Sequence, residues 1–334
     1  MYFTFPRRNV GRYTGGLLHA LLMGVACQAG VQAQDKPAGY PVKPIRIIVP
    51  VVPGGGLDTM SRAAGQMLTD QWGQTVVVDN RPGGGTVIAT ELGAKAPPDG
   101  YTILAATDTL NILGAMKRVP FDVRTAFEPI VNMTMQPYIL IVSTGLPAKS
   151  VKEMVAYSMT QALTYGSSGV GTTAHLGMER LATLTGAKFV HVPYKGGAAA
   201  LVGVLGGEIH MYPGVIVSAV QAIKAGKVRA LAAMSLKRVS VMPDLPTVAE
   251  QGWPEFKIVN SYNLFAPAGT PRPIVAAIHR VVSDGLSSPK MIQRLTADGS
   301  LPGERMTPDE LKKYFAREYD EVTRQVKNLN VKLF

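Results

Sequence analysis

A buried strand, a glycine turn and a helix start follow one another in Ile45-Arg46-Ile47-Ile48-Val49-Pro50-Val51-Val52-Pro53-Gly54-Gly55-Gly56-Leu57-Asp58. After the glycines, the apolar residues Leu57, Met60 and Ala64 fall three or four positions apart, as on one face of an amphipathic helix. Glycines let a ligand approach the backbone, and the first turn of a helix offers unpaired N–H groups with partial positive charge. The stretch therefore predicts an anion-binding corner. No lysine follows the glycines as in a phosphate loop, so the anion need not be a nucleotide.

The N-terminus has the parts of a secretory signal peptide: a basic start rich in arginine, an apolar segment 17–27, and Val31-Gln32-Ala33 as a signal peptidase site. We expect cleavage near Ala33, so that residues 1–33 are removed and the mature protein is periplasmic. A membrane anchor is the alternative, but the apolar segment is shorter than the ~20 residues that span a bilayer. A lipid anchor on Cys27 is a second alternative. It is not favoured, because the leucine usually found three positions before a lipidated cysteine is missing.

Composition excludes several classes of site. Cys27 is the only cysteine, so the mature chain offers no disulfide, zinc–thiolate site or cysteine nucleophile. The histidines outside the signal peptide show neither i, i+4 spacing nor acidic partners, so we expect no metal and no cofactor. The net charge is +11, but the basic residues are scattered and not interleaved with aromatic residues. We therefore expect no nucleic-acid binding, and instead attraction of small anions by the overall field.

Strand-like and helix-like segments alternate, which predicts an α/β fold with mixed or mostly parallel sheets flanked by helices. The predicted strands are Ile45–Pro50, Thr75–Asp79, Thr102–Ala106, Pro129–Asn132, Tyr138–Ser143, Leu163–Tyr165, Phe189–Val192, Ile209–Tyr212, Arg229–Met234 and Ser261–Ala266. The predicted helices are Leu57–Trp72, Val87–Lys95, Val151–Ser158, Thr172–Thr185, Ala198–Leu205, Val217–Ala225, Pro273–Leu286 and Pro308–Asn328. The last of these begins with a capping box, in which Thr307 precedes Pro308 and Glu310 follows.

The order of these segments predicts two lobes. After Ala266 the chain is almost entirely helical and returns to the first lobe, with crossings near Gln136 and Val259. Lobe 1 then comprises residues 34–136 and 260–334, and lobe 2 comprises residues 137–259. A ligand in the cleft between them would face the carboxyl ends of strands from both lobes.

Three more strand-to-helix corners carry polar residues or glycines. Asn80–Thr86 resembles a plain turn, but it is expected on the same face as the first corner. Tyr165–His175 contains two serines, two threonines and three glycines before a helix, and predicts a second anion cradle. His191–Gly197 places Tyr194 and Lys195 where they could meet a ligand or simply lie at a turn.

A secreted serine hydrolase is an alternative for the second cradle, with Ser167 or Ser168 as nucleophile and His175 as base. The segment does not match GxSxG, and no acid is placed to orient the histidine. His175 lies inside the helix that the loop opens, which favours a structural histidine hydrogen-bonded beneath the loop.

An ordered series of motifs from residue 40 to residue 271 resembles the periplasmic solute-binding proteins of tripartite tricarboxylate transporters, also called Bug receptors. The matching motifs include Tyr40–Pro50, Pro53-Gly54-Gly55, Asp58 with Arg62, Trp72-Gly73-Gln74, Asn80–Gly83, Pro98–Thr102, Ser167-Ser168-Gly169, His175, His191–Gly196, Gly206-Gly207, Ala225-Gly226-Lys227, Pro243–Thr247 and Ala266–Pro271. The resemblance implies a two-lobed Venus-flytrap receptor without catalysis. Two loops from opposite lobes would hold a ligand carboxylate, mainly through backbone amides, hydroxyls and water.

The expected partners are a small-molecule carboxylate and a two-component membrane permease, and we expect a monomer. The predicted ligand-binding residues are Pro53, Gly54, Gly55, Gly56, Asp58, Asn80, Thr107, Ser167, Ser168, Gly169, Gly171, Thr172, His175, Tyr194 and Pro213. A ligand-dependent sensor that docks on a signalling protein would have the same site and stays open as an alternative.

The sequence departs from the family pattern where ligands are distinguished. His210 stands where an aspartate is common, which argues against an amino-acid ligand, and Tyr262 stands where a tryptophan is common. Members of the family bind dicarboxylates, tricarboxylates, aromatic carboxylates and vitamins, so the carboxylate itself is left open.

Overall fold

A computed structural model describes residues 1, 2, 4, 37–297 and 299–329. The predicted signal peptide with its cleavage site near Ala33, and Cys27 within it, lie outside the described residues apart from positions 1, 2 and 4. No helix in the described part of the chain combines the length and apolar character that crossing a membrane requires.

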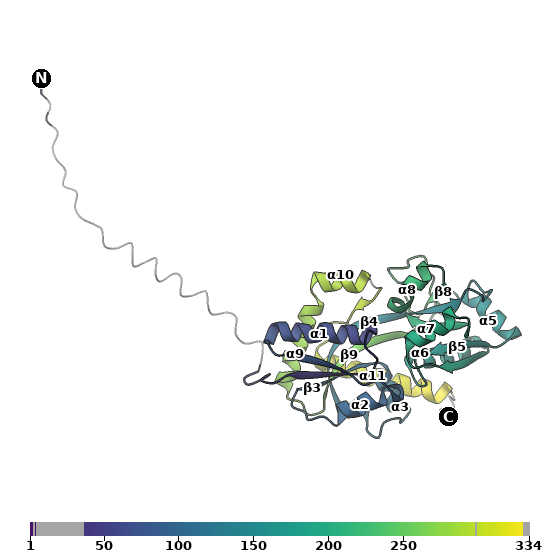
Figure 1. Cartoon of the computed structure of the whole chain (residues 1–334), viewed down its shortest axis with the longest axis horizontal. Helices are drawn as coiled ribbons and strands as arrows, with labels where there is room; N and C mark the ends of the chain where they lie inside the picture. Colours follow the sequence, from purple (N-terminus) through teal and green to yellow (C-terminus); the bar gives the residue numbers. More distant parts are fainter. Residues whose placement is uncertain (3, 5–36, 298, 330–334) are drawn as a thin grey trace. The chain divides into compact units, whose positions relative to one another are not determined.

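The strands form a mixed sheet in the order β2-β1-β3-β9-β4-β7-β5-β6, with β8 and β10 also paired to β4 (Figure 1). Their bounds are β1 Ile45–Val49, β2 Val76–Asn80, β3 Thr102–Thr107, β4 Phe127–Ser143, β5 Leu163–Ser167, β6 Phe189–Pro193, β7 Met211–Val215, β8 Val228–Ala233, β9 Val259–Pro267 and β10 Leu301–Pro302. The pairs β1–β2, β1–β3, β5–β6 and β5–β7 are parallel, whereas all pairs that involve β4 or β9 are antiparallel.

The helices cover both faces of the strands. Their bounds are α1 Gly56–Trp72, α2 Val87–Ala94, α3 Thr109–Ala115, α4 Val123–Ala126, α5 Val151–Thr160, α6 Thr173–Thr185, α7 Gly197–Leu205, α8 Ile216–Lys224, α9 Arg272–Leu286, α10 Pro289–Ala297 and α11 Pro308–Leu329, with a short 3₁₀ turn at Gly84–Thr86. In Figure 1, α1 and α10 lie on one side of the first strands, and α2 and α3 lie on the other.

Strand β1 is apolar except at Arg46, because both of its faces are covered. Ile45, Ile47 and Val49 join a core with α1 and α9, while Ile48 joins a second core with α3 and α11. Such two-sided burial is typical of parallel strands and explains why the sequence is apolar here apart from Arg46. The predicted strand, glycine turn and helix of the first corner are confirmed.

Strand β4 belongs to two sheets in turn. From Phe127 to Pro137 it pairs with β9, and from Tyr138 to Ser143 it pairs with β7 and β8. The prediction of two separate strands, Pro129–Asn132 and Tyr138–Ser143, was therefore wrong. Pro137 does not interrupt the strand, because its fixed φ suits extended backbone and it falls where the strand changes partners.

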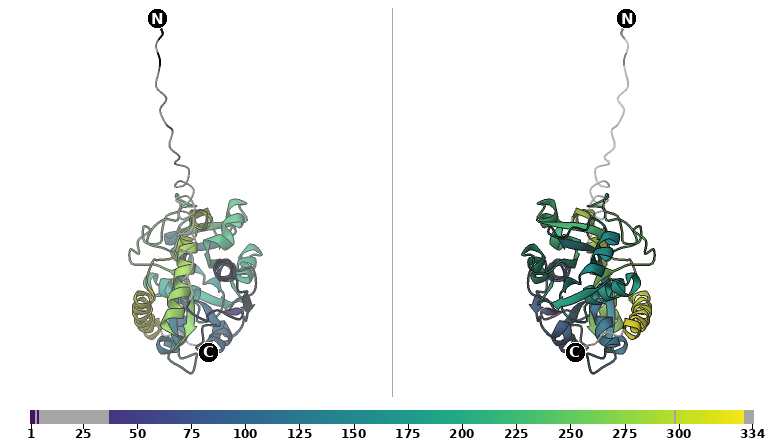
Figure 2. Two further views of the ribbon diagram at one scale, coloured as in Figure 1. Left: turned by 90° about the vertical axis from the view of Figure 1, so that its left-hand side faces the viewer. Right: turned by 90° about the vertical axis from the view of Figure 1, so that its right-hand side faces the viewer.

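The fold is the predicted two-lobed α/β architecture, with separate apolar cores on the two halves of the sheet. The capping box at the start of α11 is confirmed, since Thr307 N–H and Oγ1–H both donate to Glu310 at 2.8 Å and Glu310 N–H donates to Thr307 Oγ1. Helix α11 packs against α3 and α9 and reaches α6. The side views in Figure 2 show it, in yellow, as an outer helix.

Strand direction decides where the loops lie. Strands β1, β2 and β3 are parallel to β4, which runs from the first sheet into the second, whereas β5 and β6 run in the opposite direction. The carboxyl ends of both sets therefore point toward the junction of the two sheets. The loops that follow β1 and β5 thus approach this junction from opposite sides, as expected for a cleft between lobes.

Candidate functional site

The first loop carries an open helix start. Gly54 has φ +88°, a left-handed conformation that favours glycine, and Gly55 precedes α1 with φ −72°. Among the described residues no side chain caps this helix. Because the first N–H groups of a helix have no partner within it, the start of α1 presents free donors toward the junction.

A buried carboxylate fixes the shape of this loop. Asp58, 2% exposed, accepts hydrogen bonds from Gly54 N–H and Asn80 Nδ2, both at 2.9 Å, and pairs with Arg62 at 3.0 Å. Asn80 Nδ2 also donates to Val51 O. Burial raises the pKa of Asp58, but hydrogen bonds from Arg62, Gly54 and Asn80 outweigh it and leave the pKa below its usual value. Asp58 and Asn80, the two predicted polar residues, thus stabilise the loop through hydrogen bonds to its backbone and to each other.

The second loop, Ser167–Thr172, is tied together by its own hydroxyls. Ser167 Oγ–H donates to Gly169 O and lies 2.7 Å from His191 Nε2, and Thr172 Oγ1–H donates to Gly169 O at 2.9 Å. Thr172 also caps α6 by accepting from His175 N–H. Gly169 and Gly171 have φ +136° and +76°, so glycine is required at both positions. The predicted residues of this loop are therefore brought together.

Two histidines and a tyrosine stack beneath the second loop. The rings of His175 and His191 have centroids 3.9 Å apart, and Tyr165 stacks on His191 at 5.0 Å. His175 Nδ1 accepts from Gly171 N–H at 3.0 Å, which confirms the interpretation of a histidine hydrogen-bonded under the loop. Burial lowers the pKa of His175 to about 4, and burial together with His175 lowers the pKa of His191 to about 4.

Two hydroxyls at the start of α6 are not used by the protein. Thr173 Oγ1 is buried without a hydrogen-bond partner among the described residues. Ser168, half-buried on the same loop, likewise has no side-chain hydrogen bond within the described part of the chain. Thr173 Oγ1 is enclosed by the protein, whereas the half-buried Ser168 hydroxyl can be reached by an external acceptor.

The turn Gly83–Thr86 touches the second loop from the other half of the sheet. A Cβ atom on Gly85 would lie 3.5 Å from Val170 O. Gly83, Gly84, Gly85 and Thr86 all have positive φ, which is unusual for a β-branched residue such as Thr86. The glycine turn expected on the face of the first corner thus reaches the junction and meets the opposite loop.

The remaining predicted residues have different surroundings. Thr107 ends β3, and its Oγ1 accepts from Thr109 N–H. Pro213 is buried in β7 opposite Leu140. Tyr194 joins the second loop through its backbone, since its N–H donates to Ser167 O at 3.0 Å, while its hydroxyl donates to Glu208 and its ring packs against Gly203 of α7.

Asp108, Tyr138, Tyr212 and Tyr262 lie near the junction but were not among the predicted ligand-binding residues. Burial raises the pKa of Asp108 to about 7, against hydrogen bonds from the Ser261 hydroxyl and N–H. Burial also raises the pKa values of the three tyrosines, and Tyr212 and Tyr262 further raise the pKa of Tyr138. Tyr138 and Tyr212 were missed because an aromatic residue in a buried strand looks like core, whereas Tyr262 was noted only as a departure from the family pattern.

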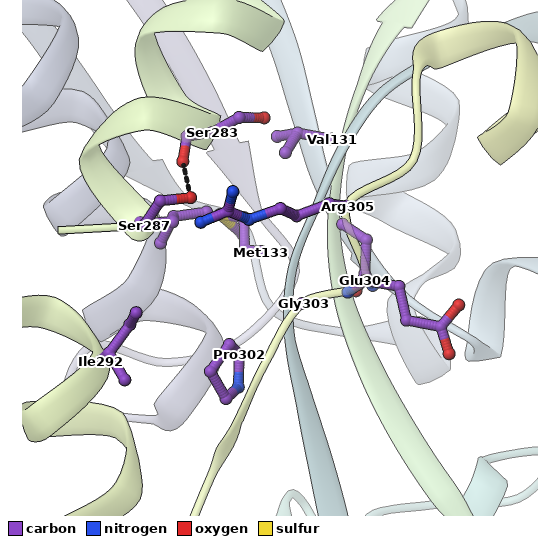
Figure 3. Close-up of a pocket in the computed structure, with 11 residues that line it drawn as sticks. Val131, Met133, Ser283, Ser287, Ile292, Pro302, Gly303, Glu304 and Arg305 are labelled. Carbon is purple, nitrogen blue, oxygen red and sulfur yellow. Dashed lines mark hydrogen bonds between the residues drawn. The ribbon is translucent and has the colours of Figure 1, made fainter. Parts of the chain in front are cut away.

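A separate pocket lies in the first half of the sheet, between α9, α10 and β10. Figure 3 shows Ser283, Ser287 and Ile292 on one side and Pro302 to Arg305 on the other. None of the predicted ligand-binding residues lines it. Among the described residues, no group of three histidines, cysteines or carboxylates could hold a metal ion.

Comparison with known proteins identifies the family. Residues 60–331 match the model of the "Tripartite tricarboxylate transporter family receptor". The chain belongs to this family. Protein BugT of Bordetella pertussis is 33% identical over 314 residues, which cover 91% of this chain and 95% of that protein. The predicted resemblance is therefore confirmed.

Solved structures of this receptor family share the fold. An R. palustris protein solved with adipate is 30% identical with a TM-score of 0.81, covering 87% of this chain and 98% of that one. MatC from Rhodopseudomonas palustris with bound malate is 29% identical with a TM-score of 0.80, and the match covers 86% of this chain and 100% of that one. These are periplasmic solute-binding proteins, and this chain is a receptor of the same kind.

Proposed function

We propose that this receptor captures a small organic carboxylate between its lobes and delivers it to a two-component membrane permease. The observation that carries the proposal is the pair of helix starts, of α1 and α6, that approach the junction from the two halves of the sheet. One start is uncapped, and the other bears the half-buried Ser168, whose hydroxyl has no partner among the described residues. Amides, hydroxyls and helix dipoles together suit a carboxylate.

The proposed lobes are residues 34–136 with 260–334, and residues 137–259, with the exported chain cleaved near Ala33. The change of partner at Pro137–Tyr138 in β4 supports the first boundary, and Val259 at the start of β9 supports the second. The adipate and malate of the two R. palustris relatives support a carboxylate as the ligand.

A binding role, not a catalytic one, is also part of the proposal. The Ser167 side chain is fully buried, and it is hydrogen-bonded to Gly169 and His191. His175 uses Nδ1 for Gly171 N–H. A hydrolase would require an accessible serine that is hydrogen-bonded to a base; the buried Ser167 instead holds the loop, and Ser168 has no imidazole partner among the described residues.

Calorimetry of the mature protein with C4–C6 dicarboxylates, citrate and aromatic carboxylates tests the proposal, with mass spectrometry of any copurified small molecule. We expect one ligand per chain. Gly55→Phe should abolish binding while preserving the fold, because a side chain there enters the space in front of α1. Gly55→Ala is the matched control, since its Cβ would lie 3.7 Å from Val51 and Val52 in ordinary contact. No binding of any organic acid, or equal affinity in both variants, would contradict the proposal.

A further inference from the structure

The turn from α9 into α10 forms one wall of the pocket in the first half of the sheet. The hydroxyls of Ser287 and Ser288 donate to Ser283 O and Gly285 O, both at 2.7 Å. These bonds satisfy carbonyl groups in the last turn of α9, which have no partner within the helix. Helix α9 therefore ends before α10 begins at Pro289, and the pocket lies where the two helices meet β4 and β10 (Figure 3).

The opposite wall of the pocket is the backbone that follows β10, which is fixed to β4. Gly303 N–H donates to Met133 O at 3.2 Å, and Glu304 N–H donates to Asn132 Oδ1 at 2.9 Å. A Cβ atom on Gly303 would collide with Asn132 O, so only glycine permits this close approach. Arg305 follows directly, and its side chain therefore leaves the backbone at the edge of the pocket.

Two polar side chains of the pocket are not used by the protein. In Figure 3 the side chain of Arg305 reaches across the pocket toward Ser287 and Met133. Arg305 is exposed, and its guanidinium has neither a hydrogen bond nor an ion pair among the described residues. The hydroxyl of the half-buried Ser283 likewise has no hydrogen bond within the described part of the chain. Glu304 is the one carboxylate among the described lining residues, and Figure 3 shows it directed away from the pocket.

The rest of the pocket is mainly apolar and small. Val131, Leu286, Ile292 and Pro302 contribute apolar side chains to the lining. The cavity has a volume of about 60 Å³. Because about 10–15 Å³ of such volume holds one water molecule, the cavity has room for about four to six non-hydrogen atoms. A carboxylate group with a short alkyl tail has this size.

We propose that the pocket is a second ligand site, separate from the junction, that binds a short-chain monocarboxylate of the size of acetate to butyrate. The carboxylate accepts hydrogen bonds from the Arg305 guanidinium and the Ser283 hydroxyl, and the alkyl tail contacts Leu286 and Ile292. The site does not depend on the proposed function, because no residue of the two proposed carboxylate-binding loops lines it.

The chemistry of the lining selects this class of ligand. A guanidinium presents paired N–H donors that match the two oxygens of a carboxylate, and the charge strengthens both hydrogen bonds. A cation would meet Arg305 with no carboxylate directed into the pocket. Inorganic phosphate would place charged oxygens against the apolar side of the cavity, where they have no donor, and such burial is costly. A neutral alcohol fits the cavity but lacks the charge that Arg305 pairs with.

Nuclear magnetic resonance of the isotope-labelled mature protein tests the proposal, with Gly55→Phe present to close the proposed site at the junction. The protein is titrated with butyrate, butylammonium, butanol and phosphate. We expect saturable shift changes at the amides of Gly303 and Glu304 and at Arg305 Nε–H with butyrate, and none with butylammonium or phosphate. No change with butyrate, or equal binding of butanol or phosphate, would overturn the inference. Shift changes in the two loops report on the junction instead, so a failure of the proposed function is read separately.

Two variants test the donors. Arg305→Gln should weaken butyrate binding at least about tenfold, because a charge-assisted interaction is lost, and Ser283→Ala should weaken it about two- to tenfold. Arg294→Gln is the matched control, since Arg294 is exposed on α10 and does not line the pocket. Equal butyrate affinity in Arg305→Gln and Arg294→Gln would overturn the inference.

Discussion

His175 and His191 stack with ring centroids 3.9 Å apart beneath the loop that opens α6. One accepts from Gly171 N–H through Nδ1, and the other meets Ser167 through Nε2. A protonated imidazole has no acceptor nitrogen, so the Gly171 contact exists only while His175 is neutral. The conformation of the proposed carboxylate loop is therefore coupled to the charge of a buried histidine pair.

This coupling predicts that the stability of the fold decreases in acid. Both histidines have a pKa of about 4 in the fold and 6.5 as the reference for the unfolded chain. Between these values the unfolded state binds more protons, so stability rises with pH from about 4 to about 6.5 and is then constant for these groups. The charge of Glu179 raises the pKa of His191 and so reduces the pH dependence of stability that His191 contributes.

Thermal denaturation across this range should show a shallower pH dependence for His175→Asn than for the wild type. Asparagine can place an acceptor near Nδ1 without titrating. Ligand affinity should also fall more steeply with acid in the wild type. Parallel pH profiles for both proteins would show that His175 is not the group responsible.

Asp108 predicts the opposite pH dependence of stability over nearly the same pH range. Its pKa is about 7 in the fold against 3.8 as the reference, so the folded state keeps a proton that the unfolded state has lost. Stability contributed by this group therefore falls as pH rises from about 4 to about 7, and is constant above. Asp108→Asn removes the titration, so its melting temperature relative to wild type should increase between about pH 4 and about pH 7. A constant difference would contradict the prediction.

Asp58 should be required for the shape of the first loop. Asp58→Ala leaves the Gly54 and Asn80 donors without their acceptor, which should cost about 1–3 kcal/mol of unfolding free energy and weaken ligand binding at least tenfold. Asp70→Ala, on the same helix with an exposed side chain bonded to Gln66, is the control. Chemical denaturation and calorimetry measure both effects, and matching values for the two variants would refute the assignment.

The capping box of α11 should affect stability alone. Thr307→Ala removes an N-cap and should cost about 1 kcal/mol of unfolding free energy, measured by urea denaturation. Ligand affinity should be unchanged because Thr307 lies at the far end of lobe 1 from the loops. A loss of binding in this variant would show that α11 is coupled to the site.

The corners of the fold could be predicted because each is encoded locally. An apolar strand, a glycine turn and a helical period lie next to one another at Ile45–Trp72 and again at Leu163–Thr185. The short α3, α10 and β10 were missed, since their segments are too brief or too polar for a periodic signal. The direction of the Tyr194 side chain depends on Gly203 and Glu208, which no local pattern reveals.

The candidate site could likewise be predicted only in part. Glycines and hydroxyls of the two loops could be found from the sequence, because backbone exposure requires those residue types. The stacking of His175 on His191 could not, since the two residues lie on segments that meet only through the sheet order. Asp58 illustrates both, as its position in α1 was predicted but not its burial beneath Gly54.

The passage of β4 through both sheets has a consequence for how the chain acquires its structure. The core beside α1 combines residues 40–133 with residues 262–295, whereas the core beside α6 is complete within residues 138–258. A chain delivered N-terminus first must therefore wait for β9 before its first half can close, while its middle can already fold. The core beside α1 is thus completed only after nearly the whole polypeptide has emerged.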